Sequence, residues 1–380
     1  MFVTESFNRQ LDDLLERICS KLQISSAQHR LAQDRYETIG NWLGARESPL
    51  AMFNPVIYPQ GSLRIGTTVR PCSGQEYDLD LVCEVQLDWR QVERPVAVLD
   101  AVEQRLKKYD TYKTMLERKK RCIRVNYANE FHLDILPACP DPSSGTTCVV
   151  VPDRDVRGWK PSNPKGYAAW FESRAKTFEV YLAEHQEPLP SQEPVEMKAP
   201  LKRVVQLIKR WRDLKYADDQ KIAPISIVLT TLAAEHYGGQ QSTSEALAGI
   251  LAGIVASIPP RNQRLLVLNP KNTKEDLSEK WDENPDAYEA FVSGIIAFHQ
   301  SWQDIARGRG IPSVSATLRD LFGEDLTKSV VKEQAESIQK ARSEQRLHMQ
   351  KSTGILSGLT TAGSVSVRSN TFYGSQEVLP

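Results

Sequence analysis

Two aspartates stand two residues apart at the start of an apolar run, shortly after a Gly-Ser turn. The run reads Asp78-Leu79-Asp80-Leu81-Val82, and the turn is Gly61-Ser62. Because side chains alternate along a β-strand, Asp78 and Asp80 point to the same side of the predicted strand. Neighbouring carboxylates repel each other and resist joint ionisation unless a cation lies between them. The pattern therefore predicts a strand that binds Mg²⁺, a hard ion that prefers oxygen ligands and is usually shared with substrate phosphates.

A third aspartate, Asp134, stands inside another apolar run. Strand-like segments at residues 121–127 and 130–136 are separated by Ala128-Asn129, which indicates a β-hairpin. A carboxylate inside such a strand is expensive to bury without a partner. If this strand pairs with the first one, Asp78, Asp80 and Asp134 converge and hold two Mg²⁺ ions roughly 3.5–4 Å apart, with Mn²⁺ as an alternative metal. Asp134 is then the natural general base of the three predicted catalytic carboxylates.

The Gly61-Ser62 turn precedes a predicted short helix. Glycine lets backbone amides approach a phosphate closely, and the serine hydroxyl adds a donor. On its own, such a turn is usually an ordinary turn, and an acidic pair is often a surface feature of a strand. The conjunction of the turn, the pair and Asp134 favours a nucleotidyl transfer site.

Composition limits the possible partners. The 380 residues suffice for two domains, and 48 basic residues balance 48 acidic ones. Without net charge, the chain has no overall basic field that would favour binding to long nucleic acid. No apolar stretch is long enough to span a membrane, and the N-terminus lacks the features of a signal peptide. Six scattered cysteines without a CxxC pair predict a cytoplasmic protein with reduced, mostly buried thiols.

Periodicity predicts an α+β fold with a mixed α/β catalytic lobe followed by a helical lobe. One or two helices are expected over 5–46, a strand over 78–86 and a helix over 94–109, while residues 56–60 fit an edge strand or a turn. Prolines after residue 136 predict an irregular loop over 137–165. From 198 onward the pattern is helical nearly throughout. The later helices are predicted at 166–185, 198–215, 224–237, 243–257, 286–306 and 328–349.

The predicted domains follow from these segments. Residues 1–195 form an N-terminal helix plus the nucleotidyltransferase catalytic core, and residues 196–350 form a helical lobe that completes the nucleotide-binding cleft. Residues 351–380 are rich in Ser, Thr and Gly and predict a flexible tail.

The motifs resemble those of a known superfamily. The stretch Gln60-Gly61-Ser62-x-x-x-Gly66-Thr67, followed by Glu76-Tyr77-Asp78-Leu79-Asp80-Leu81-Val82, resembles the polymerase-β-like nucleotidyltransferases. Within them, the chain is most similar to the bacterial cGAS/DncV-like nucleotidyltransferases, which make cyclic oligonucleotides in anti-phage (CBASS) operons. Residues 132–138 match the third-carboxylate strand of that group, and residues 205–211 and 223–226 resemble the helical lobe of oligoadenylate synthetases and their bacterial relatives. The resemblance implies a polymerase-β-like core, a mixed sheet with helices, followed by a helical lobe.

The resemblance also implies an activity and its residues. The expected enzyme makes a cyclic di- or oligonucleotide second messenger from nucleoside triphosphates, ATP or GTP, with Mg²⁺ and with release of pyrophosphate. Gln60, Gly61 and Ser62 would bind the nucleotide. Lys209 would contact the triphosphate and Ser226 the triphosphate or the base. The alternatives are a solvated lysine in a basic helix and a serine that caps a helix.

Four further residues allow two interpretations each. Ser162 and Asn163 either contact the nucleotide or belong to an ordinary Ser-Asn-Pro turn. Trp211 and Tyr237 either stack on a base or belong to the core, and aromatics at helical spacing favour the core.

The resemblance leaves alternatives for partners and function. The product would act on a CBASS effector. A ubiquitin-like transfer enzyme would attach the C-terminal tail to target molecules, and the alternative is that the tail is simply disordered. Known conjugated tails usually end in a small residue, whereas this sequence ends in Pro380. The sequence contains no Cys/His cluster at the spacing of zinc ligands, so we do not expect zinc-mediated DNA binding. The alternative functions are nucleotide transfer to RNA or to a small molecule, and a catalytically silent nucleotide-binding regulator, against which the three aspartates weigh.

Overall fold

The computed structural model describes residues 2–72, 77–127, 131–176, 187–260, 263–307, 311–350, 356–357 and 364–367. The chain divides into two compact units, one of residues 19–306 and one of residues 1–18 together with 307–380. The predicted domain boundary at residue 195 lies inside the larger unit, so the sheet and the helices that follow it as far as residue 306 belong to one unit.

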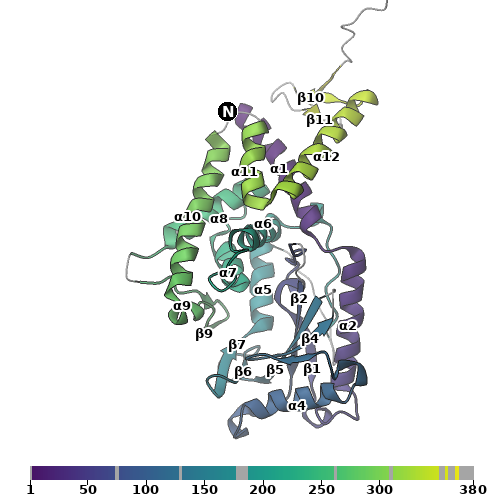
Figure 1. The fold of residues 1–380 in the computed structure, drawn as a ribbon, viewed down its shortest axis with the longest axis vertical. Coiled ribbons are helices and arrows are strands. Elements are labelled where there is room, and N and C mark those ends of the chain that lie inside the picture. Colours follow the sequence, from purple (N-terminus) through teal and green to yellow (C-terminus); the bar gives the residue numbers. More distant parts are fainter. Residues whose placement is uncertain are drawn as a thin grey trace, which may run out of the picture. The chain divides into compact units, whose positions relative to one another are not determined.

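A mixed sheet with the strand order β1-β2-β5-β4-β3 forms the centre of the larger unit (Figure 1). Its strands are β1 Val56–Gln60, β2 Tyr77–Glu84, β3 Leu116–Arg118, β4 Ile123–Tyr127 and β5 Phe131–Pro140. Strands β2 and β5 pair in parallel, and the other neighbours in this order pair antiparallel. The predicted strand at 78–86 and the β4–β5 hairpin are confirmed, and residues 56–60 are the edge strand. The residues between β4 and β5, 128–130, lie outside the described part of the chain.

Alternation along the central strands separates an apolar face from a polar one. Leu79 and Leu81 of β2 and Leu133 of β5 are fully buried in the main core cluster. Two helices, α2 Ser26–Gly44 and α4 Val96–Lys107, pack against this face (Figure 1). Because side chains alternate, the aspartates of β2 and β5 lie on the opposite face of the sheet.

The predicted loop at residues 137–165 is wrong. Strand β5 continues to Pro140, and its end pairs with the hairpin of β6 Val149–Asp153 and β7 Gly158–Ser162. A proline removes only its own N–H from the ladder, so it is tolerated where that position needs no donor. The buried β-branched run Val149–Val151 favours a strand and outweighs the prolines.

The helices agree with the predictions in most cases. Residues 5–46 form two helices, and residues 177–186 of the predicted helix at 166–185 lie outside the described part. The helices are α1 Phe2–Leu22, α5 Pro164–Ala175, α6 Pro200–Lys215, α7 Ser226–His236, α8 Thr243–Ser257 and α10 Pro285–Arg307. The sequence did not predict a hairpin of β8 Leu268–Asn269 and β9 Asn272–Asp276, nor the short helix α9 Lys280–Glu283. These elements are too short to show a period.

The smaller unit contains α11 Ile311–Phe322 and α12 Glu324–Ser343. Within it, Gln334 of α12 donates a hydrogen bond to Asp13 at 2.7 Å. Short strands β10 His348–Gln350, β11 Leu356–Ser357 and β12 Ser364–Ser366 form a small sheet. Two of these strands lie inside the predicted tail, and most of that tail is outside the described part.

Two predictions from composition can be compared with the structure. The six cysteines are thiols and not disulfides, and four are buried, as predicted: Cys19, Cys83, Cys139 and Cys148. Among the helices in the described ranges, none is both long and apolar enough to cross a bilayer.

Candidate active site

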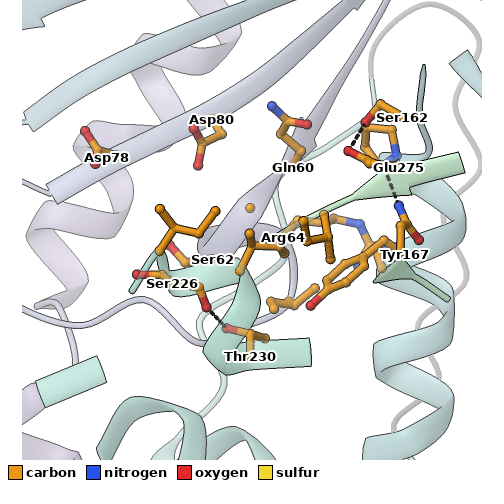
Figure 2. Close-up of a pocket in the computed structure, with 18 of the residues that line it drawn as sticks. Gln60, Ser62, Arg64, Asp78, Asp80, Ser162, Tyr167, Ser226, Thr230 and Glu275 are labelled. Carbon is orange, nitrogen blue, oxygen red and sulfur yellow. Dashed lines mark hydrogen bonds between the residues drawn. The ribbon is translucent and has the colours of Figure 1, made fainter. Parts of the chain in front are cut away.

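A cavity of about 680 Å³ opens on the polar face of the sheet, within the larger unit. It lies where β2 meets the short helix α3 Gly61–Arg64, and α6, α7, β7 and β9 also contribute to its lining (Figure 2). Its volume is in the range typical of small-molecule sites, about 300–1,000 Å³. The lining includes every predicted site residue except Asp134: Gln60, Gly61, Ser62, Asp78, Asp80, Lys209 and Ser226.

The carboxylates of Asp78 and Asp80 repel each other when no cation is bound between them. The Cα partner of Asp80 on β5 is Asp134, which confirms that the strands carrying the three aspartates are neighbours. Burial, together with the charges of Asp134 and Asp78, raises the pKa of Asp80 to about 7. Burial also raises the pKa of Asp78, whose side chain is about half exposed (53%). A cation beside Asp78 and Asp80 would relieve this repulsion, and their oxygens suit a hard divalent ion.

Arg124 of β4 binds the third carboxylate. It is the Cα partner of Asp134, and its Nε and Nη2 donate to the two oxygens of Asp134 at 2.7 Å each. Nη2 also donates to Asp78 Oδ1 at 3.1 Å. Among the residues that the structure describes, no three His, Cys, Asp or Glu side chains are arranged to hold a metal ion. The three-carboxylate metal site therefore stays a prediction, and a guanidinium is the counter-charge of Asp134 in the structure.

The predicted short helix is confirmed, but Gly61 and Ser62 are its first two residues and not a turn before it. The glycine is required by the aspartate next to it. Gly61 has a φ of +65°, in the left-handed region that favours glycine. A Cβ atom on Gly61 would lie 2.2 Å from Oδ2 of Asp80. The Ser62 hydroxyl lies 3.2 Å from that of Thr68. The start of α3 and the aspartate pair are thus in direct contact across 19 positions of sequence, counted from Gly61 to Asp80.

We expect Gly61→Ala to lower product formation about tenfold. The methyl group would occupy the space of the Asp80 carboxylate, and the left-handed backbone costs a non-glycine residue roughly 1–2 kcal/mol. Steady-state rates of the purified variants measure the effect. Gly44→Ala is the matched control, because no atom lies within 4 Å of a Cβ added there. Equal losses in both variants would contradict this explanation.

Lys209 is buried, so the solvated alternative is wrong. It projects from α6 and its Nζ donates to the carbonyl oxygen of Thr67 at 3.2 Å and to its hydroxyl at 3.1 Å. Burial lowers the pKa of Lys209 to about 8. Ser226 is the first residue of α7, and the position before it, Ile225, makes no side-chain cap, so the helix-cap alternative is not observed. Both residues face the cavity that also contains Asp80.

The four residues with two interpretations separate clearly. Asn163 is a cap: its side chain accepts from the amide of Gly166 at 2.9 Å, as expected for a turn residue. Ser162 lines the cavity. Trp211 stacks on Phe298 with ring centroids 4.8 Å apart, and Tyr237 is buried, so the core interpretation of both aromatics is confirmed.

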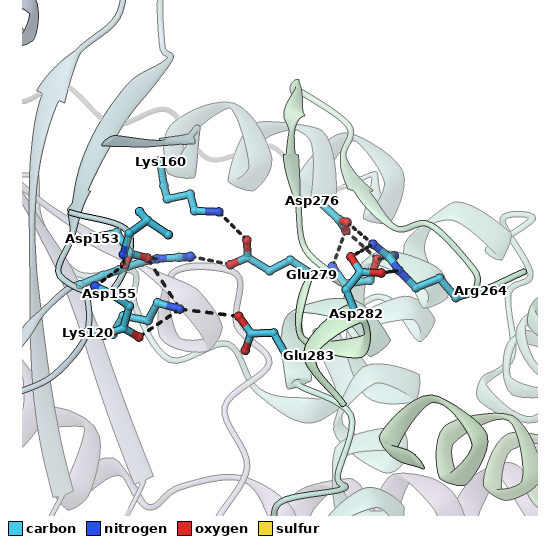
Figure 3. Close-up of polar contacts among 12 residues, drawn as sticks. Lys120, Asp153, Asp155, Lys160, Arg264, Asp276, Glu279, Asp282 and Glu283 are labelled. Atoms are coloured by element: carbon cyan, nitrogen blue, oxygen red, sulfur yellow. Dashed lines mark hydrogen bonds and ion pairs between the residues drawn. The ribbon is translucent and has the colours of Figure 1, made fainter. Parts of the chain in front are cut away.

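The residues that line one side of the cavity were not predicted from the sequence. Arg121 and Lys160 line it together with residues of the β8–β9 hairpin and α9. Arg121 bridges Asp153, at 2.6 Å, and Glu279, while Lys160 donates to Glu279 at 2.9 Å (Figure 3). Glu279 lies more than a hundred positions after Arg121 and Lys160, and no local spacing connects it to them. Only the pairing of β7 and the packing of β9 beside it bring them together.

The chain is similar to known synthases over its whole length. Residues 9–174 match the Second Messenger Oligonucleotide or Dinucleotide Synthetase domain. A c-di-GMP synthase of Roseivirga ehrenbergii is 33% identical over 382 residues, which cover 98% of this chain and 100% of that protein. The cyclic dinucleotide synthase CdnG of Bradyrhizobium diazoefficiens is 28% identical, over 74% of this chain and 72% of that protein.

A solved structure extends the likeness to the fold. The structure of the Bradyrhizobium diazoefficiens CD-NTase CdnG in complex with GTP matches with a TM-score of 0.69 and 25% identity. The match covers 86% of this chain and 99% of that one. The chain therefore belongs to the cGAS/DncV-like nucleotidyltransferases, the second messenger oligonucleotide or dinucleotide synthetases, and is an enzyme with a polymerase-β-like core that makes a cyclic nucleotide second messenger.

Proposed function

We propose that this enzyme joins two molecules of GTP into a cyclic dinucleotide with release of pyrophosphate. The observation that carries the proposal is one cavity lined by Gly61, Asp78, Asp80, Lys209 and Ser226. The Roseivirga relative, named a c-di-GMP synthase, aligns along its full length, and the Bradyrhizobium relative was solved with GTP. Both support a guanine nucleotide as the substrate.

The residues of the chain divide the work between phosphate binding and proton transfer. The amides and the hydroxyl of Gly61-Ser62 bind phosphate oxygens, and Lys209 adds a buried positive charge beside them. Ser226 and Gln60 complete the nucleotide contacts. Asp134 would take the proton of the attacking hydroxyl. Because it does not line the cavity and Arg124 donates to both of its oxygens, this role requires Arg124 to release one of them toward the substrate.

A divalent metal ion is required in this family, and we propose Mg²⁺, with Mn²⁺ as a substitute. Asp78 and Asp80 would hold the metal, with Asp134 as a third ligand. When bound, the metal lowers the barrier by neutralising negative charge on the triphosphate and its leaving group. The aspartate pair, with the raised pKa of Asp80, fits this role because a cation restores the ionised form.

The proposal extends to the wider setting of the enzyme. The segment 196–350 would form the helical lobe that completes the nucleotide cleft, since α6 and α7 supply Lys209 and Ser226. A cytoplasmic antiphage role follows from the likeness to CD-NTases, with an effector that binds the product. A ubiquitin-like transfer enzyme that acts on residues 351–380 would be a second partner.

Incubation of the purified enzyme with labelled nucleotides and Mg²⁺ tests the proposal. We expect GTP alone to give a phosphatase-resistant product whose mass equals that of two linked GMP units, and EDTA to abolish it. Mass spectrometry identifies the product. An extract of phage-infected cells is added in parallel, so that an enzyme that needs an activator also registers. Transfer of label to RNA or to a small molecule, without a cyclic product, would contradict the proposal.

A further inference from the structure

Glu275 of β9 lies at the end of the cavity away from the aspartate pair. Figure 2 shows it beside Ser162, with Gln60 between them and Asp80 in this view. Its Oε1 accepts a hydrogen bond from the Ser162 hydroxyl at 3.0 Å, and its Oε2 accepts one from the Asn269 side chain at 2.7 Å. Both donors also line the cavity. The carboxylate is therefore fixed in position by neutral donors, with one side-chain donor on each oxygen.

The acceptor capacity of Glu275 is only partly used. An ionised carboxylate offers about four lone-pair sites; the hydrogen bonds from the Ser162 and Asn269 side chains take two of them, and the backbone amide of Asn163 also donates. Burial raises the pKa of Glu275, although its hydrogen bonds and the charge of Arg121 act in the opposite direction. A ligand that donates to the remaining acceptor capacity of its two oxygens would compensate this partly buried charge.

A second carboxylate in the same cavity shows the contrast. Glu279 also lines the cavity, but its oxygens are bound by Lys160, at 2.9 Å, and by Arg121 (Figure 3). The two cations lower the pKa of Glu279 despite its burial. Glu279 is thus neutralised by the protein itself, whereas Glu275 is held by a hydroxyl and an amide.

We propose that Glu275 recognises the guanine base of a bound GTP, accepting hydrogen bonds from the ring N1–H and the 2-amino group. The inference rests on the proposed function and assigns its base specificity to one residue. Among the common bases, guanine alone presents two adjacent donors on its pairing edge, and these match the two oxygens of a carboxylate. Adenine places a lone pair at N1, which an ionised carboxylate repels. If the phosphates of GTP bind at Gly61-Ser62, the guanine base can extend to the end of the same cavity that contains Glu275.

Inosine triphosphate tests the inference, because it differs from GTP only by the missing 2-amino group. We expect the wild-type enzyme to prefer GTP over ITP by about tenfold or more in kcat/KM, as for loss of a hydrogen bond to a charged group. In Glu275→Gln and Glu275→Ala this ratio should approach one. Glu279→Gln is the matched control: it should lower the values for both nucleotides alike and leave the ratio unchanged.

Binding of the α,β-methylene analogues of GTP and ATP, measured by calorimetry, separates this inference from the proposed function. Selective binding of the guanine analogue that is lost in Glu275→Gln, without any cyclic product, would support the inference and overturn the function. A cyclic product formed with an unchanged GTP/ITP ratio in Glu275→Ala would overturn the inference alone. If neither analogue binds to the wild-type enzyme, both the inference and the proposed function are overturned.

Discussion

Asp80→Asn is expected to lower kcat at least about a thousandfold and, in the absence of metal, to make the folded enzyme more stable at pH 8. The activity is lost because the carboxylate belongs to the pair that would hold the metal and is the less exposed of the two. Several kcal/mol of metal-dependent transition-state stabilisation correspond to a factor of this size. Product formation and thermal unfolding, each with and without Mg²⁺, are the two measurements.

The gain in stability follows from the sign of the pKa shift. The folded protein holds the pKa of Asp80 at about 7, above the ordinary value of about 3.9 in an unfolded chain. Between these pH values the folded state binds more protons than the unfolded state, so folding stability falls as the pH rises through this window. Three pH units correspond to about 4 kcal/mol, the upper limit of what Asp80→Asn would recover at pH 8. Added Mg²⁺ should stabilise the wild type and not the variant.

Asp78→Asn is the matched control for this effect. Its carboxylate is about half exposed (53%), so the substitution should lower activity as strongly while raising metal-free stability less than Asp80→Asn does. Part of that rise would come through Asp80, whose pKa the charge of Asp78 raises. The double variant Asp78→Ala with Asp80→Ala should remain folded and inactive. Activity equal to that of the wild type in the double variant would show that the site is assigned wrongly.

Lys209→Met is expected to weaken GTP binding about a hundredfold. Removal of one partner from a buried charged contact costs about 2–5 kcal/mol, which supports a loss of this size. Lys209 carries a buried amine that contacts Thr67 on the cavity wall. Calorimetric binding of a non-reactive α,β-methylene GTP analogue measures the affinity.

The same calorimetric titration should detect the uptake of a proton by Lys209 when the analogue binds. Burial lowers the pKa of Lys209 to about 8, so at pH 8 roughly half of the free enzyme carries the neutral amine. A bound triphosphate favours the cation, and binding at pH 8 should therefore take up roughly half a proton. Titrations in buffers with different ionisation enthalpies report this uptake, and the affinity of the wild type should fall as the pH rises above 8.

Lys198→Met controls for burial alone. Burial lowers the pKa of Lys198 to about 8 as well, but Lys198 is not among the residues that line the cavity. Its replacement should leave the proton uptake intact. If Lys209→Met keeps the uptake, or if Lys198→Met removes it, Lys209 is not the residue that faces the triphosphate.

Short-range pattern predicted the catalytic strand and its neighbours well. The alternation around Asp78 and Asp80 predicted β2, and the β4–β5 hairpin also formed where expected, while Gly61 begins the short helix α3 and does not lie in a turn before it. These features depend on neighbouring residues and on backbone geometry, which a single sequence displays directly. Where two local signals competed, as at residues 137–165, the prolines were given too much weight and the β6–β7 hairpin was missed.

The sequence by itself determined the strand with two aspartates, the glycine before it and the third aspartate on a hairpin. Only the tertiary structure decided that Arg124 binds Asp134, that Lys209 is buried, and that Glu275 lies in the same cavity. The physical reason is that charge pairing and burial depend on which distant segments pack together. The period of a strand or the φ angle of a glycine depends on the local chain alone.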